Sequence, residues 1–114
     1  MLIREIKDIL DAKVLCGEDL LDTEVKSACG SDLMSDVLAF VKEQSVLLTG
    51  LMNPQVVRTA DMMDMRCIVF VRGKEPEEAV VELARQRDIV MMTTAQRMFV
   101  ACGKLYSAGL VGNS

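Results

Sequence analysis

Three apolar segments recur along the chain at nearly constant spacing. They cover residues 46–49, 67–71 and 89–93, so they begin 21 and 22 residues apart. Each is followed by a turn signal and then by apolar residues at helical spacing. A strand, a helix and a second strand of this combined length form a parallel crossover unit, which is right-handed and gathers its loops at the strand C-terminal ends. The spacing therefore predicts an α/β fold built from successive βα units.

The N-terminal part of the chain predicts two more strands and two more helices. Apolar residues at three- and four-residue spacing predict helices over residues 2–12 and 31–42. Short apolar stretches predict strands over residues 13–16 and 24–29. The sheet then has four or five mainly parallel strands, with the strand at 13–16 at an edge and helices on both faces. The uninterrupted apolar run at 67–71 is typical of a central strand that is covered on both faces.

Length and composition predict one soluble globular domain. A chain of 114 residues, 51% apolar and 26% charged, has room for one core but not for two. We expect the single domain 1–114 to have an ordered core over residues 2–108 and a frayed tail over 110–114. No apolar stretch is long enough to span a bilayer, and the charged start of the chain differs from a signal peptide. These features predict a cytoplasmic protein that contacts no membrane.

Charge and cysteine usage argue against two kinds of site. A net charge of -4 with scattered basic residues disfavours nucleic acid, because phosphate binding needs a clustered Lys and Arg surface. The chain has no His, and its four cysteines are too far apart in sequence to form a metal-binding pair. We therefore expect no metal site and no cofactor. The cysteines expected to be reduced and buried are Cys16, Cys29, Cys67 and Cys102.

Capping signals and apolar stripes predict where the later helices lie. Asn53 followed by Pro54 predicts the start of a helix, because Asn caps the first turn and Pro suits the first helical position. Thr93 and Gln96 are three residues apart and match a capping box for the final helix. The predicted buried face of that helix is Met98, Phe99, Cys102 and Leu105.

The nine methionines are expected mainly in the core, where Met fills irregular gaps. Met62 and Met65 are the exceptions, because both lie off the predicted inward stripe of the helix that begins at Pro54. Exposed apolar side chains of this kind favour a self-association face. We therefore expect a homodimer.

Candidate ligand-binding residues follow the predicted strands, because parallel sheets bind ligands beyond the C-terminal ends of their strands. The loops there supply hydroxyl, backbone and cationic groups, and we expect Ser31 and Asp32 close by. Helix N-termini at this edge offer free N–H groups and partial positive charge, which favour an anion such as phosphate. The candidate residues are Thr49, Gly50, Asn53, Arg72, Gly73, Lys74, Thr93 and Thr94.

The sequence contains no common catalytic motif. Phosphate-binding loops, dinucleotide fingerprints, nucleophile elbows and zinc-protease motifs are absent, and there is no His to act as a base. Asp61 and Asp64 could form a carboxylate pair, but their place on an outer helix face favours a solvated surface. The loop chemistry favours a non-enzymatic module that binds a small anion. The alternatives are a ligand-free interaction subunit of a larger metabolic or redox complex and an enzyme that uses a cysteine of low pKa.

Four stretches of sequence resemble a known family. They are KDILDAKVLCGEDLLDTEVK at residues 7–26, SDLMSDVLAF at 31–40, VFVRGKEP at 69–76 and DIVMMTT at 88–94. Together they resemble the DRTGG domain, which is similar to the N-terminal domain of HPr kinase/phosphorylase, over about residues 2–108. Such domains occur beside CBS domains in some pyrophosphatases, in some phosphate acetyltransferases and as free-standing proteins. The resemblance implies a regulatory or assembly role and a nucleotide-like or phosphorylated ligand, without catalysis.

The chain departs from two turns of that family. Members tend to carry a Gly-Asp-Arg-like turn before the central helix and a Thr-Gly-Gly-like turn after the next strand. The corresponding segments here are residues 53–55, with the sequence Asn-Pro-Gln, and residues 71–73, with the sequence Val-Arg-Gly. Only the final glycine matches. The resemblance therefore assigns no catalytic residue to this chain.

Overall fold

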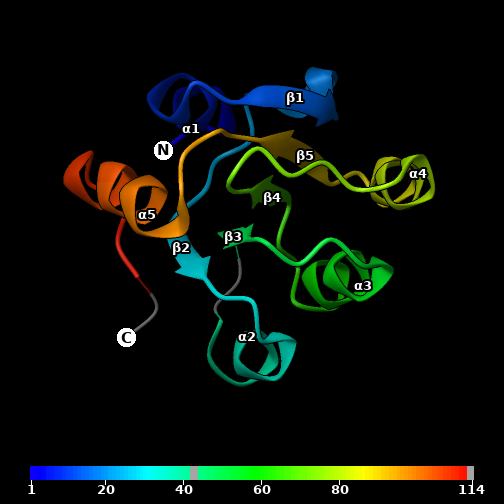
Figure 1. Cartoon of the computed structure of the whole chain (residues 1–114). Coiled ribbons are helices and arrows are strands. Elements are labelled where there is room, and N and C mark those ends of the chain that lie inside the picture. Colours follow the sequence, from blue (N-terminus) through cyan, green and yellow to red (C-terminus); the bar gives the residue numbers. More distant parts are fainter. Residues whose placement is uncertain (42–43, 113–114) are drawn as a thin grey trace.

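Strands and helices alternate along the chain, as the repeated spacing predicts (Figure 1). This computed structural model describes residues 1–41 and 44–112. The strands are β1 (Lys13–Cys16), β2 (Ser27–Gly30), β3 (Ser45–Thr49), β4 (Cys67–Phe70) and β5 (Val90–Thr93). The helices are α1 (Ile3–Leu10), the short 3-10 helix η1 (Glu18–Leu20), α2 (Met34–Phe40), α3 (Pro54–Met62), α4 (Glu78–Gln86) and α5 (Met98–Ser107).

The five strands form one sheet in the order β1-β5-β4-β3-β2. Strands β2 to β5 are parallel neighbours, whereas β1 pairs antiparallel with β5 at one edge. β4 is the central strand, and all four of its residues are buried, in agreement with its uninterrupted apolar sequence. The predicted α/β class, with a mainly parallel sheet and a short N-terminal edge strand, is confirmed.

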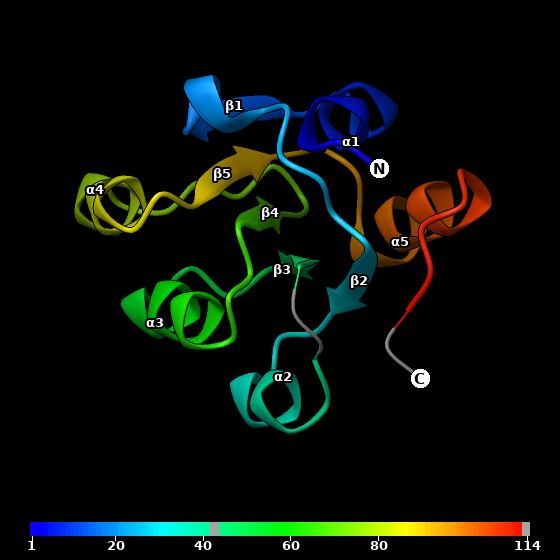
Figure 2. The same cartoon turned by 180° about the vertical axis from the view of Figure 1, so that it is seen from behind.

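Helices cover both faces of the sheet. Because β2 to β5 follow one another in sequence and in space, right-handed crossovers place α2, α3 and α4 on the same face. α1 and α5 lie together on the other face, as Figures 1 and 2 show. The side chains of alternate β4 residues point to opposite faces of the sheet. Val69 packs in the core with Ile6 and Leu105, and Phe70 packs in the core with Val57 and Ala84.

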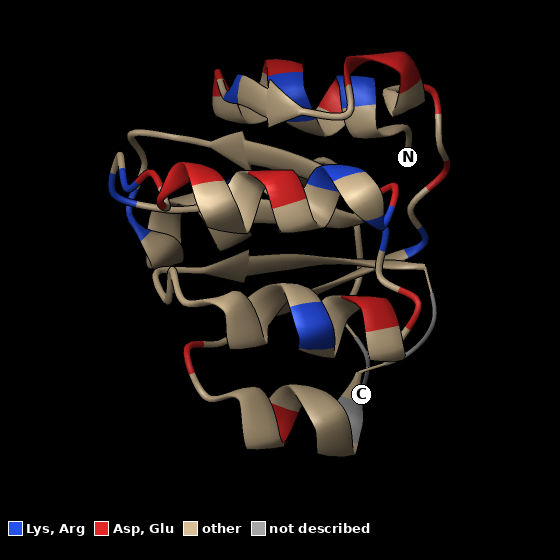
Figure 3. Cartoon of the chain, turned by 90° about the vertical axis from the view of Figure 1, so that its right-hand side faces the viewer, with Lys and Arg blue, Asp and Glu red and all other residues tan. Residues whose placement is uncertain are grey.

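The C-terminal ends of the four parallel strands share one edge of the sheet, so the loops that follow them meet there. Figure 3 shows Lys and Arg segments at the edge toward which the arrows of the parallel strands point. α3 begins at this edge in the predicted way. The Oδ1 atom of Asn53 accepts a hydrogen bond from the N–H of Gln55 at 3.0 Å, and Pro54 occupies the first turn.

The predicted capping box at the start of the final helix is wrong. α5 begins at Met98, and Arg97 stands at its N-cap without a side-chain capping bond. Thr93 instead ends β5, and its hydroxyl donates to the carbonyl of Lys74 at 2.6 Å. The hydroxyl of a threonine at the end of a strand can form a hydrogen bond with a neighbouring loop. Here that bond forms in place of the predicted capping bond.

Two apolar side chains lie opposite to their predicted places. Phe99 is 88% exposed, because α5 starts later than predicted and packs through Ala101 and Leu105. Met65 is fully buried, because α3 ends at Met62 and the chain turns back, with the N–H of Met65 donating to the carbonyl of Ala60 at 2.8 Å. The prediction for Met65 assumed helical spacing beyond Met62, where α3 has already ended, and so placed this side chain on the wrong face. Met65 therefore cannot contribute to a self-association face.

Two element starts in the N-terminal half are displaced from their predicted places. The hydroxyl of Ser31 accepts from the N–H of Leu33 at 3.0 Å, which forms a local turn, and α2 begins after it. Glu24 forms an isolated antiparallel bridge with Leu2, and β2 begins three residues later. For α2, the end predicted at residue 42 lies outside the described residues.

The C-terminal segment packs against the rest of the fold beyond residue 108, where the ordered core was predicted to end. Leu110 is only 5% exposed, and Val111 forms an isolated parallel bridge with Ser27. The carbonyl of Val111 accepts from the N–H of Ala28 at 2.9 Å. The predicted tail over residues 110–114 is therefore anchored to β2 at its start, and residues 113–114 lie outside the described part.

An ion-pair cluster connects α3 to the segments before β4 and β5. The carboxylate of Asp61 accepts from Nη1 of Arg87 at 2.6 Å and from Nη2 of Arg66 at 3.2 Å. Arg66 also lies 3.3 Å from a carboxylate oxygen of Asp64. Asp61 is thus held by two arginines, whereas Asp64 makes one ion-pair contact and its side chain is 65% exposed.

Asp61 is expected to make the protein less stable in acid. The hydrogen bond from Arg87, followed by that from Arg66, lowers the pKa of Asp61 below its usual value. Its stabilising contribution is present above the unfolded pKa of about 4 and is lost as the pH falls through the lower folded pKa. Thermal unfolding of Asp61→Asn should therefore depend less on pH in this acidic range than unfolding of the wild type. Equal slopes for the two proteins would contradict this assignment.

Candidate functional site

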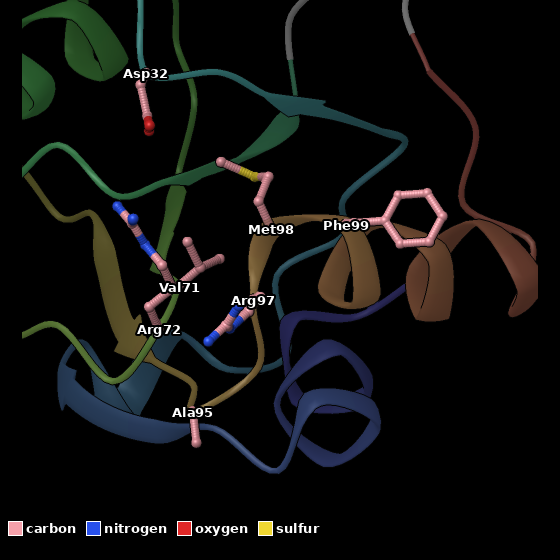
Figure 4. Close-up of a pocket in the computed structure, with 7 residues that line it drawn as sticks. All are labelled: Asp32, Val71, Arg72, Ala95, Arg97, Met98 and Phe99. Carbon is pink, nitrogen blue, oxygen red and sulfur yellow. The ribbon is translucent and has the colours of Figure 1, made fainter.

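The loops at the C-terminal edge of the sheet line an open pocket of about 740 Å³. Its lining comes from the loops after β2, β4 and β5 and from the first turn of α5 (Figure 4). In Figure 4 the Arg72 side chain extends toward Asp32, and Arg97 enters from the segment that precedes α5. The lining residues are Asp32, Val71, Arg72, Ala95, Arg97, Met98 and Phe99.

Asp32 is fixed in place by the loop after β3. Its Oδ1 atom accepts a hydrogen bond from the hydroxyl of Thr49 at 3.0 Å and another from the N–H of Gly50 at 2.7 Å. Both bonds fall on the same carboxylate oxygen. Within residues 1–41 and 44–112, Oδ2 has no hydrogen-bond partner, so one oxygen of an oriented carboxylate is left to accept from a ligand.

Arg72 is held through its backbone rather than its side chain. Its N–H donates to the carbonyl of Gln96 at 2.7 Å, and the N–H of Gly73 donates to the carbonyl of Thr94 at 2.8 Å. The φ angle of Arg72 is 62°, a left-handed conformation that costs a non-glycine residue free energy. Its guanidinium group lies over Gly50, so a side chain at position 50 would require the end of the Arg72 side chain to shift.

Two guanidinium groups line the pocket without a carboxylate partner. Arg72 and Arg97 are exposed, and in the part of the chain that the structure describes neither forms an ion pair. Four other arginines in the fold are paired: Arg4 with Asp22, Arg66 and Arg87 with Asp61, and Arg85 with Glu82. Arg58 on α3 likewise forms no ion pair within the described residues, but it lies outside the pocket. The two pocket arginines are thus free to bind an anion from solution.

The N-terminus of α5 adds positive potential to the same pocket. It has no side-chain capping bond and no acidic residue in its first turn, and its first residues Met98 and Phe99 line the pocket. The unbonded N–H groups and the helix dipole at such an end attract anions. The other helix starts at this edge differ, because Asn53 caps α3 and Glu78 occupies the first turn of α4.

Of the eight predicted ligand-binding residues, Arg72 lines this pocket. Thr49 and Gly50 lie outside the lining but form hydrogen bonds to Asp32, which belongs to it. The other five lie at the same edge but outside the residues that line it: Asn53, Gly73, Lys74, Thr93 and Thr94. Their contacts are structural, since the hydroxyl of Thr94, for example, donates to the carbonyl of Leu10 at 2.7 Å. A ligand-binding role for all eight residues stays a prediction.

Sequence reasoning missed Arg97 and Phe99 as lining residues. The capping box predicted at Thr93 placed both within the body of the final helix rather than at its start. The useful signal was the isolated arginine just before the apolar segment that forms α5. Asp32 was expected near the site, and the structure places it in the lining.

None of the four cysteines has the properties of an activated nucleophile. Burial is the main cause that raises the pKa of Cys16, Cys29, Cys67 and Cys102 above that of a free thiol. Catalytic cysteines need the opposite shift, because the thiolate is the reactive form. Across the described ranges, no three Cys, Asp or Glu side chains gather to hold a metal ion, and no helix is long and apolar enough to cross a membrane.

Comparisons with known proteins identify a family and a solved structure of similar fold. The family model of the DRTGG domain matches residues 5–107. A similar solved structure contains the CBS and DRTGG domains of the regulatory region of Clostridium perfringens pyrophosphatase, complexed with its activator diadenosine tetraphosphate. The TM-score is 0.72 at 17% identity, with 91% of this chain and 45% of that chain covered, so this chain spans less than half of that length. No curated protein matches the sequence.

Proposed function

Because the chain belongs to the DRTGG domain family, we propose that it is a non-enzymatic regulatory module that binds a small anionic ligand. The observation that carries the proposal is the pair of guanidinium groups, Arg72 and Arg97, that line one pocket without carboxylate partners in the described residues. Arginine binds phosphate through paired, charge-assisted hydrogen bonds. The pocket also lies where open parallel sheets usually bind ligands.

The charge of the pocket favours a nucleotide-like or phosphorylated ligand. The two arginines and the open N-terminus of α5 converge on one pocket, which combines side-chain cations with backbone N–H donors. Its volume of about 740 Å³ falls in the range of small-molecule sites. The complex of the pyrophosphatase regulatory region with a dinucleotide activator supports the same ligand class.

Within this proposal the residues have different roles. Arg72 and Arg97 contact the anion, and Thr49 and Gly50 hold Asp32 at the side of the pocket. The remaining candidates at the edge are proposed as outer contacts for a ligand that extends beyond the pocket: Asn53, Gly73, Lys74, Thr93 and Thr94.

Titration calorimetry with a panel of nucleotides and phosphorylated metabolites tests the proposal. We expect at least one phosphorylated compound to bind the wild type. Arg97→Gln should then raise its Kd about tenfold or more, because a hydrogen bond to a charged group contributes roughly 1.5–3 kcal/mol. Arg58→Gln is the matched control, since Arg58 is an exposed arginine on α3 that does not line the pocket. Absence of binding, or equal Kd values for wild type and Arg97→Gln, would refute the proposal.

A ligand-free protein-interaction subunit is the second candidate, and one observation favours it. The outer face of α5 exposes Phe99 by 88%, Tyr106 by 72% and Val100 by 42%. Large exposed apolar side chains on one helix are typical of a contact surface. If this face joins two copies in the predicted homodimer, light scattering should give a dimer mass that Phe99→Ser with Tyr106→Ser reduces to a monomer mass. If the protein is a ligand-free interaction subunit, calorimetry with the same panel should show no ligand binding.

A further inference from the structure

We infer that the pocket selects a phosphate ester that carries hydroxyl groups, such as a nucleotide or a sugar phosphate, over a bare inorganic anion. The inference rests on the proposed function and assigns the selectivity to Asp32. This residue places a carboxylate in the wall of a pocket that otherwise presents two cations.

Asp32 is not a counter-ion for the arginines. Figure 4 shows the Arg72 side chain directed toward it, yet no ion pair joins Asp32 to Arg72 or to Arg97 among the described residues. Its position is set instead by Thr49 and Gly50, both of which bond its Oδ1 atom. The carboxylate is therefore held in the pocket by neutral donors, and its charge remains available to a ligand.

A fixed carboxylate discriminates between two kinds of anion. An ionised pyrophosphate presents mainly acceptor oxygens and negative charge, so Asp32 repels it. The hydroxyl groups of a ribose are donors, and the free Oδ2 of Asp32 can accept from them while the arginines bind the phosphate. A ligand with an anionic end and a hydroxylated body satisfies both parts of the pocket.

The volume of the pocket agrees with a ligand larger than a single phosphate. About 740 Å³ suits an organic molecule of moderate size rather than one tetrahedral ion. Asp32, Arg72 and Arg97 line the same pocket, and in Figure 4 the Arg72 side chain extends toward Asp32. The hydroxylated body would lie toward Asp32 and the phosphate toward Arg97.

Asp32→Asn provides the test, with pyrophosphate, ribose 5-phosphate and ADP as probes in calorimetry. The amide oxygen of Asn can still accept from Thr49 and Gly50, so the loop contacts are preserved and an unchanged Tm verifies the fold. We expect the wild type to bind the two esters more tightly than pyrophosphate. In Asp32→Asn the esters should bind about tenfold more weakly, because an ionic acceptor is lost, while pyrophosphate should bind more tightly because a repelling charge is gone. Asp36→Asn, an exposed change on α2 outside the pocket, is the control.

The outcomes separate this inference from the proposed function. Tighter binding of both esters than of pyrophosphate supports the inference. ADP binding more tightly than ribose 5-phosphate then indicates a nucleotide, and equal binding of the two indicates a sugar phosphate. If Asp32→Asn tightens all three probes equally, or if it changes none, Asp32 does not select the ligand and the inference is wrong. In that case anion binding that still depends on Arg97 leaves the proposed function intact. If none of the probes binds to the wild type, the inference is wrong as well.

Discussion

The Arg72→Gly variant is expected to be more stable than the wild type and to bind a phosphorylated ligand about tenfold more weakly or worse. The φ angle of Arg72 is 62°. A side chain in this left-handed region costs about 1–2 kcal/mol, whereas glycine adopts it without steric strain. The same substitution removes a guanidinium that has no partner among the described residues, so little folding free energy is lost with it.

The size of the stabilisation follows from two opposing effects. Relief of the left-handed conformation stabilises the variant. Glycine has more conformational freedom in the unfolded chain, which reduces the gain in the free energy of unfolding by about 0.5–1 kcal/mol. The net gain in the free energy of unfolding should be up to about 1 kcal/mol. Chemical denaturation measures it, and calorimetry with ADP measures the loss of binding.

Asp88→Gly is the matched control for Arg72→Gly. Asp88 also has a left-handed backbone, with a φ of 56°, and it follows the end of α4, away from the pocket. This variant should gain stability in the same way, because glycine is favoured just after a helix, but it should keep the wild-type affinity. If Arg72→Gly loses stability and still binds ligand normally, then Arg72 is a structural residue and its assigned role is wrong.

Phe70→Ala is expected to cause a large loss of stability. Phe70 is fully buried on the central strand β4, where it packs in the core formed with α2, α3 and α4. Removing a buried aromatic side chain leaves a cavity and costs about 3–5 kcal/mol. That is a large part of the roughly 5–15 kcal/mol by which most domains are stable.

Phe99→Ala is the control, because Phe99 is 88% exposed and contributes little to the core. Urea denaturation of the two variants compares the same chemical change at a buried and at an exposed position. Phe70→Ala should lower the midpoint strongly, and Phe99→Ala should leave it close to that of the wild type. Equal losses in both variants would contradict the placement of the core.

The parallel sheet was predictable because its signals are local. Strands covered on both faces need apolar residues at every position, so β4 is visible in the sequence as an uninterrupted run. The start of α3 is encoded in two adjacent residues, Asn53 and Pro54, whose side chains act within the first turn. Such short-range effects do not depend on the rest of the fold.

The lining of the pocket was harder to predict because it depends on contacts between distant segments. The hydroxyl of Thr93 could cap a helix or bond a neighbouring loop, and only the position of Lys74 beside it decides between the two. This choice sets where α5 begins and so brings Arg97 to the pocket. The fixed orientation of Asp32 likewise depends on Thr49, a residue on a different strand.

Backbone amide chemical shifts recorded by NMR during a titration with ADP test the central claim most directly. The claim is that a phosphorylated ligand binds in the pocket between the loops after β2, β4 and β5. The predicted result is a saturable set of shift changes centred on Asp32, Gly50, Arg72 and the first turn of α5, which Arg97→Gln weakens. Changes confined to another surface, or no change at all, would contradict it.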